Sequence, residues 1–136
     1  MRISTGVIFA AHGAQKLFTF GFAGVAGAFG QMDVPFPSVM GPTVALLEFF
    51  GGLALILGLL TRLASAGLAL NMLGAILLEH LSAGFFNPTG VEFPLSLFSA
   101  AVSLVLTGAG SWSVDALFAR RGTESNTPAL PMRRAA

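Results

Sequence analysis

Four long apolar segments with few charged residues divide the chain. They run at about 3–20, 43–60, 63–81 and 93–110. An α-helix rises about 1.5 Å per residue, so roughly 20 apolar residues are needed to cross a hydrocarbon core of about 30 Å. The fourth segment is the cleanest, because no charged residue lies between Glu92 and Asp115. The pattern predicts an all-α membrane four-helix bundle in one domain, residues 1–115.

The first segment is the weakest of the four. It starts directly at Arg2, which leaves little chain to reach the cytoplasmic headgroups and leaves open whether the native start lies upstream of Met1. The stretch, with Ala26-Gly27-Ala28 after it, also resembles a signal peptide and its cleavage site. Because His12 and Lys16 interrupt the apolar run, we favour a membrane helix.

A glycine-rich stretch separates the first and second segments. Glycine recurs at every third position from 21 to 30, and Phe22, Val25 and Phe29 form a helical i, i+3, i+7 stripe. This pattern predicts a short interfacial helix or a shallow re-entrant segment. The prolines at 35, 37 and 42 should break any helix before the second span. Thr61-Arg62 is expected to form a tight turn that makes the second and third spans an antiparallel hairpin.

Small residues on the second and third spans predict close helix packing, since lipid provides no hydrophobic drive between helices. The glycines expected in such contacts are Gly51, Gly52, Gly58, Gly67 and Gly74. Hydroxyl side chains follow one face of the fourth span, at Ser96, Ser99, Ser103 and Thr107. They are expected to bond back to the preceding helical turn or across to a neighbouring helix.

The composition supports a membrane protein. Of the 136 residues, 54% are hydrophobic and 10% are charged, whereas about a quarter of the residues of a soluble domain are charged. The mean hydropathy is +0.82. A formal net charge of +1 gives no reason to expect nucleic-acid binding. The lack of cysteine excludes disulfides, thiolate metal sites and a dithiol relay within this chain, so redox chemistry would need a bound cofactor or a partner.

The basic residues predict the orientation in the membrane. Six of the seven fall on one side: Arg2, Arg62, Arg120, Arg121, Arg133 and Arg134. Because cytoplasmic connections are enriched in Lys and Arg, the N-terminus and the C-terminus are both expected to be cytoplasmic. The polar, proline-bearing residues 116–136 are expected to form a disordered cytoplasmic tail.

Seven polar residues are predicted to lie near the outer side: His12, Gln15, Lys16, Glu48, Glu79, His80 and Glu92. An ionisable group inside a membrane costs about 2.5 to 3.5 kcal/mol on insertion scales, so each needs a partner or a function. Three interpretations stay open. The layer is structural, with Glu48 paired to His12 or Lys16; or it lines a pocket for a quinone-like or other small ligand, with proton transfer through His12 and Glu48; or it receives a soluble partner.

Metal or haem binding is a separate question, because His12, His80, Glu48 and Glu79 are potential ligands. No compact motif such as His-x-x-x-His is present, so neither a metal nor a haem is expected. Asn71, midway along the third span, is expected to form an interhelical hydrogen bond.

Three separated motifs resemble the DoxX family of small bacterial inner-membrane proteins. The first is Gly6-x-x-Phe9-x-x-His12-Gly13-x-Gln15-Lys16-Leu17-Phe18; the second is Glu48-x-x-Gly51-Gly52-x-x-Leu55-x-Leu57-Gly58-Leu59-x-Thr61-Arg62; the third is Gly84-Phe85-Phe86. The resemblance covers about residues 2–115. Many relatives begin with extra apolar residues before the position of Arg2, which agrees with the short first span.

The resemblance implies a four-helix membrane bundle related to the membrane subunit of a thiosulfate:quinone oxidoreductase. It places any site of such a protein at His12, Gln15, Lys16, Glu48, Arg62 and His80. We therefore expect a membrane-embedded accessory subunit of an oxidoreductase system, with quinone as the candidate ligand. The expected partners are the lipid bilayer, a redox partner protein and further copies of the chain. The alternative is a non-enzymatic scaffold or a small transporter subunit; whether the chain is itself an enzyme stays open.

Overall fold

The computed structural model describes residues 1–86 and 89–118. Its helices are α1 (Arg2–Ala14), α2 (Gly21–Gln31), α3 (Pro37–Leu57), α4 (Thr61–Ala75) and α5 (Glu92–Thr107). Two π-helical segments, η1 (Gln15–Phe20) and η2 (Ile76–His80), continue α1 and α4, and a short 3₁₀ turn, η3 (Leu81–Ala83), follows. No strand occurs in these described ranges, so the all-α prediction is confirmed.

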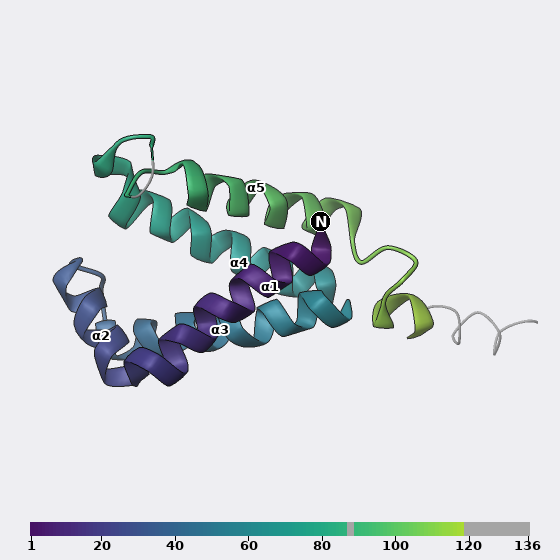
Figure 1. The fold of residues 1–136 in the computed structure, drawn as a ribbon, viewed down its shortest axis with the longest axis horizontal. Helices are drawn as coiled ribbons and strands as arrows, with labels where there is room; N and C mark the ends of the chain where they lie inside the picture. The colour runs from purple at the N-terminus through teal and green to yellow at the C-terminus, as the bar shows by residue number, and fades with distance from the viewer. Residues whose placement is uncertain (87–88, 119–136) are drawn as a thin grey trace, which may run out of the picture.

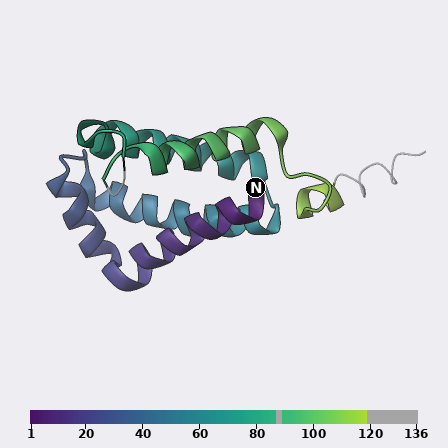
Figure 2. The ribbon, with the colours of Figure 1, turned by 45° about the horizontal axis from the view of Figure 1, so that its top comes forward.

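The helices form two packed pairs. Helix α1 packs along α3 and helix α4 packs along α5, while α2 turns back onto α3 (Figure 1). Figure 2 shows the α4–α5 pair beside the α1–α3 pair. Phe9, Leu55 and Leu68 are almost fully buried in the core between the pairs, together with Leu97 and Leu104.

Glycines allow α1 to approach α3 closely. A Cβ added at Gly6 would lie 2.7 Å from the carbonyl oxygen of Gly52, and one added at Gly13 would overlap the backbone of Phe49. Gly6 and Gly13 were not among the glycines expected in helix contacts, because the sequence pattern drew attention to the second and third spans. The closest backbone approach involving α3 is therefore with the first helix.

The five expected packing glycines have different surroundings. A Cβ at Gly51 would lie 3.3 Å from Leu68, and one at Gly67 would lie 3.1 Å from Leu47, so both sit at the α3–α4 contact. Gly52 faces α1. Gly58 ends α3 in the left-handed conformation, with φ of 71°. Gly74 differs from the expectation, since a Cβ there would meet no atom within 4 Å.

Two boundaries differ from the predicted ones. Helix α3 begins at Pro37, about six residues earlier than expected, because proline is well accommodated in the first turn of a helix. Pro42 lies inside α3 and does not end it. The turn between α3 and α4 lies at residues 58–60, where Gly58 and Leu60 have positive φ, and Thr61 and Arg62 already belong to α4.

The outer surface of the helices is strongly apolar. Two helical stretches are long and apolar enough to cross a membrane: Pro37–Leu57, with mean hydropathy 1.8, and Thr61–Ala83, with mean hydropathy 1.4. Helix α5 is apolar but shorter. Large exposed side chains on these helices include Leu53, Leu57, Leu63, Leu70, Leu77 and Leu106. An apolar exterior of this extent suits contact with lipid.

At the end of the molecule that holds the N-terminus, polar side chains bind backbone groups. The Arg2 guanidinium donates to the carbonyl oxygens of Ala109 and Trp112, each at 2.8 Å. The Asp115 carboxylate accepts hydrogen bonds from the backbone N–H groups of Leu60 at 2.7 Å and Thr61 at 2.9 Å. We call these contacts the Arg2–Asp115 cap. They supply the start of α4 with the acceptor that an N-cap residue usually provides.

The electrostatic environment of Asp115 follows from the same contacts. Its partial burial alone would raise the pKa of the carboxyl group. The hydrogen bonds from the backbone of Thr61 and Leu60, and the nearby Arg2 guanidinium, stabilise the ionised form more strongly. The pKa of Asp115 is therefore below its ordinary value.

Candidate functional site

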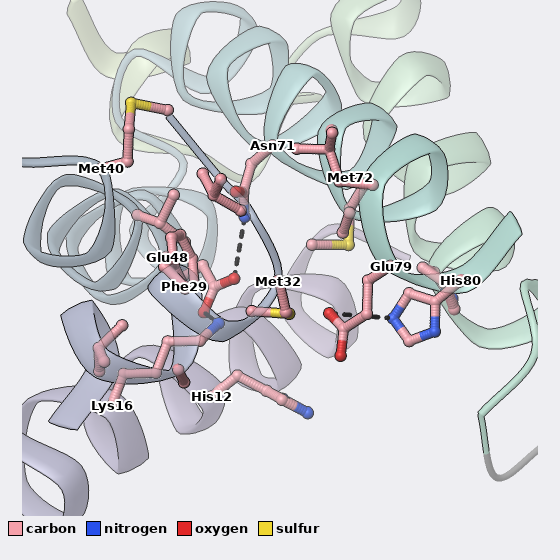
Figure 3. Close-up of a pocket in the computed structure, with 18 of the residues that line it drawn as sticks. His12, Lys16, Phe29, Met32, Met40, Glu48, Asn71, Met72, Glu79 and His80 are labelled. Carbon is pink, nitrogen blue, oxygen red and sulfur yellow. Dashed lines mark hydrogen bonds and ion pairs between the residues drawn. The ribbon is translucent and has the colours of Figure 1, made fainter. Parts of the chain in front are cut away.

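A cavity of about 770 Å³ lies at the opposite end of the helices from the Arg2–Asp115 cap. Its walls come from α1, η1, α2, α3, α4, η2 and α5 (Figure 3). Most of the lining side chains are apolar, and the larger ones are Phe9, Phe20, Phe29, Phe93, Met32, Met40 and Met72. This size and this apolar character are typical of small-molecule sites.

A buried carboxylate forms the centre of the polar part of the cavity wall. Glu48 on α3 is 2% exposed. One carboxylate oxygen is paired with the ammonium of Lys16, and the other accepts a hydrogen bond of 2.9 Å from the Asn71 side-chain amide. We call Lys16, Glu48 and Asn71 the polar triad. Because each residue comes from a different helix, the triad ties η1, α3 and α4 together at the level of the cavity.

The partners of Glu48 in the polar triad offset the free-energy cost of burying its charge. An isolated carboxylate is costly to remove from water, and pairing with a cation and hydrogen-bond donors offsets that cost. Sequence analysis left open whether Glu48 pairs with His12 or Lys16; the structure pairs it with Lys16. Asn71 makes the interhelical hydrogen bond expected of it, and its acceptor is Glu48.

Both π-helical segments lie beside the cavity. Lys16, Thr19 and Phe20 of η1 line it, as do Leu78 and other residues of η2. A π-helical turn is wider than an α-helical turn, is rare, and is frequent at functional sites. Both of these π-helical segments occur where polar side chains reach the cavity.

Two histidines line the cavity and have similar hydrogen bonds. Nδ1 of His12 lies 2.9 Å from the carbonyl oxygen of Ile8, and Nδ1 of His80 lies 2.7 Å from that of Thr89. The His12 ring also packs against Phe93, with 5.9 Å between ring centroids. Nε2 of His80 lies 3.7 Å from a carboxylate oxygen of Glu79.

The structure brings together five of the seven predicted polar residues. His12, Lys16, Glu48, Glu79 and His80 all line the cavity. Gln15 is exposed on η1, and Glu92 begins α5; neither lines the cavity. Within the described ranges, no cluster of three or more His, Cys, Asp or Glu side chains could hold a metal ion.

The arginines expected to mark the cytoplasmic side are described in part. Arg2 belongs to the Arg2–Asp115 cap, and the guanidinium of Arg62 lies 3.4 Å from the carbonyl oxygen of Leu106. Arg120 and Arg121 lie outside the described residues, as does most of the expected tail at 116–136.

Some residues of the cavity wall had no clear signal in the sequence. Phe29 lies on α2, Met32 directly follows α2, and Met40 lies near the start of α3, in a region expected to be interfacial or broken by proline. Their apolar side chains are unremarkable in an apolar chain. The packing of α2 onto α3 brings Phe29 and Met32 to the cavity that the polar triad also lines.

The helical fold, the apolar spans and the buried triad define a helical membrane protein with a ligand-sized cavity beside the triad. The DoxX family model matches residues 1–81, and the chain belongs to the DoxX family. It is 34% identical to "Putative oxidoreductase CatD" of Bacillus subtilis (strain 168), over 85% of this chain and 81% of that protein. It is 35% identical to "Inner membrane protein YqjF" of Escherichia coli (strain K12), over 88% of this chain and 90% of that protein. No solved structure matches the chain.

Proposed function

We propose that this DoxX-family protein is the membrane-embedded accessory subunit of an oxidoreductase system, and that its cavity binds a quinone. The observation that carries the proposal is the polar triad in the wall of an apolar cavity of about 770 Å³. The similarity to a relative named as an oxidoreductase supports the redox context.

The chemistry of the cavity suits a quinone. The ring and its isoprenoid tail would contact the aromatic and methionine side chains, while a ring carbonyl needs one hydrogen-bond donor. An ammonium group has three N–H donors, so Lys16 can hold Glu48 and still donate to a ligand. Glu48 and Asn71 would keep the Lys16 ammonium in place. The lining would exclude water from the bound ring.

The proposal includes a topology. Helices α1 with η1, α3, α4 with η2, and α5 would cross the bacterial inner membrane as a four-helix bundle. The Arg2–Asp115 cap and Arg62 would lie on the cytoplasmic side, since basic residues are enriched there. The cavity would then open toward the outer half of the bilayer, where a partner protein or a second copy of the chain would meet it.

Ligand titration tests the proposal. Purified protein in lipid nanodiscs would be titrated with short-chain ubiquinone and menaquinone analogues, with binding followed by calorimetry. We expect saturable binding that Lys16→Met or Glu48→Gln weakens by about tenfold or more, as for loss of one hydrogen bond to a charged group. Gln15→Ala is the matched control, because Gln15 shares η1 with Lys16 but does not line the cavity. Absence of saturable binding, or binding indifferent to both Lys16→Met and Glu48→Gln, would refute the proposal.

The alternative function is a scaffold or a small transporter subunit with a structural polar layer. The observation that favours it is that both carboxylate oxygens of Glu48 already have partners within the protein. Under this alternative, Glu48→Gln and His12→Ala lower the melting temperature in detergent. Any partner-dependent redox rate, measured per folded molecule, then stays unchanged.

A further inference from the structure

In both histidines of the cavity wall, Nδ1 is the ring nitrogen that contacts a backbone carbonyl oxygen. A carbonyl oxygen only accepts hydrogen bonds, so the contacts to Ile8 and Thr89 require a proton on Nδ1 of each ring. In the neutral ring, Nε2 then carries a lone pair and is an acceptor. His12 and His80, which both line the cavity, therefore each carry an acceptor atom of the same kind.

The Glu79 carboxylate adds a further acceptor beside His80. Its Nε2 lies 3.7 Å from a carboxylate oxygen of Glu79, and Glu79 also lines the cavity. Two acceptors at this distance do not satisfy each other when the ring is neutral. A hydroxyl group placed beside them would supply the missing donor.

The polar triad has the opposite character. The Lys16 ammonium has only donors, and Glu48 is held by Lys16 and Asn71. The cavity wall thus presents donors at the triad and acceptors at the two histidines and Glu79 (Figure 3). A quinone has carbonyl oxygens and can only accept. A dihydroxybenzene, the reduced form of the same ring, both accepts and donates.

We propose that the acceptor atoms of His12 and His80 make the cavity selective for the reduced, dihydroxy form of an aromatic ring over its oxidised quinone form. This inference rests on the proposed function, since it specifies which form of the ligand the same cavity retains. It concerns binding and requires no electron transfer within the chain.

The test compares three ligands that share one ring. A short-chain ubiquinol, its dimethyl ether and the corresponding ubiquinone would be titrated anaerobically into the full chain in nanodiscs. The ether keeps the ring and its oxygen atoms but has no hydroxyl donor. We expect the diol to bind about tenfold more tightly than either the ether or the quinone, which is the size of effect expected for one good hydrogen bond.

Variants identify the residues responsible. His12→Phe and His80→Phe keep an aromatic ring but remove the acceptor, so each should bring the affinity for the diol toward that for the ether while leaving the affinity for the ether unchanged. Gln15→Ala should change neither value. If a variant does not fold, the three-ligand comparison on the unaltered protein still decides.

The outcomes separate this inference from the proposed function. Equal saturable binding of diol, ether and quinone would overturn the selectivity and leave the quinone-type site in place. A preference for the diol that persists in both phenylalanine variants would overturn the role of the histidines. If none of the three ligands binds, both the site and its selectivity are refuted.

Discussion

The two ends of the helix assembly use polar side chains in different ways. At the Arg2–Asp115 cap, the charged groups bind backbone carbonyl and N–H groups that would otherwise lack partners. At the cavity, Lys16, Glu48 and Asn71 bind one another and line an open volume. Both ends contain charged side chains, but only those at the cavity line a volume large enough for a ligand.

The comparison shows how to distinguish polar side chains that have a structural role from polar side chains that are candidates for a functional role. The ends of helices leave backbone groups unsatisfied, so a polar side chain that binds them has a sufficient structural explanation. The hydroxyl groups of α5 have the same explanation, because Ser99, Ser103 and Thr107 each donate to the carbonyl oxygen four residues earlier. The side chains of the polar triad satisfy no helix end. A pairing of side chains beside a cavity is therefore the better candidate for ligand chemistry.

The largest expected effect comes from breaking the polar triad. Lys16→Met leaves the carboxylate of Glu48 buried with only the Asn71 hydrogen bond, and loss of one partner of a buried ion pair costs about 3 to 5 kcal/mol. We expect a fall of this size in the free energy of unfolding, measured by denaturation in mixed detergent micelles.

The double variant Lys16→Met with Glu48→Gln is the control for that prediction. It removes both charges, so it should lose much less stability than Lys16→Met alone. Strictly additive losses from the two single substitutions would show that the ion pair is not coupled in the membrane-like environment.

A smaller effect is expected at the α1–α3 contact that connects the two ends. Gly52→Ala places a methyl group 2.7 Å from the carbonyl oxygen of Gly6, and overpacking of this kind costs about 1 to 3 kcal/mol. Gly74→Ala is the matched control, because its methyl group would enter open space and alanine favours the helix by up to about 1 kcal/mol. Equal melting temperatures for the two variants would contradict the close approach of α1 and α3.

The smallest effect is expected at the Arg2–Asp115 cap. Asp115→Asn should lower the free energy of unfolding by about 0.5 to 2 kcal/mol at neutral pH, as for loss of a helix N-cap. Because the folded-state pKa of Asp115 is below its ordinary value of 3.8, the ionised carboxylate adds stability above that pH, and this stability is lost as the pH falls further.

The dependence of stability on pH gives the control for the Asp115→Asn prediction. The difference in stability between the native chain and Asp115→Asn should be full at about pH 7 and should shrink on acidification below about pH 3.8, where the carboxylate becomes protonated. A difference that does not change over this range would show that the ionised carboxylate does not carry the capping interaction.

The sequence predicted the helical segments well, because the signals that define a helix lie within short stretches of the chain. Apolar length, proline and glycine act within a few residues, so the stretches that became α1 with η1, α4 with η2, and α5 could be located from the pattern. The boundary at Pro37 was missed because proline both ends a preceding helix and starts a new one. The short helix α2 followed from the spacing of its aromatic and aliphatic residues.

The candidate site was only partly accessible from the sequence. The sequence predicted that His12, Lys16 and Glu48 lie near the outer side, because depth in the membrane depends on position along one helix. It could not choose between His12 and Lys16 as the partner of Glu48. That choice depends on how far each helix is rotated about its axis and on which helix is its neighbour.

The sequence by itself determined that this is an all-α membrane protein with polar residues gathered at one level, since composition and helical spacing are properties of the chain alone. Only the tertiary structure decided that α1 packs on α3 through Gly6 and Gly13, that Asp115 caps α4, and that Lys16 and Asn71 share Glu48. These contacts join residues more than 20 positions apart. Their formation depends on the mutual fit of whole helices, which no local pattern of residues specifies.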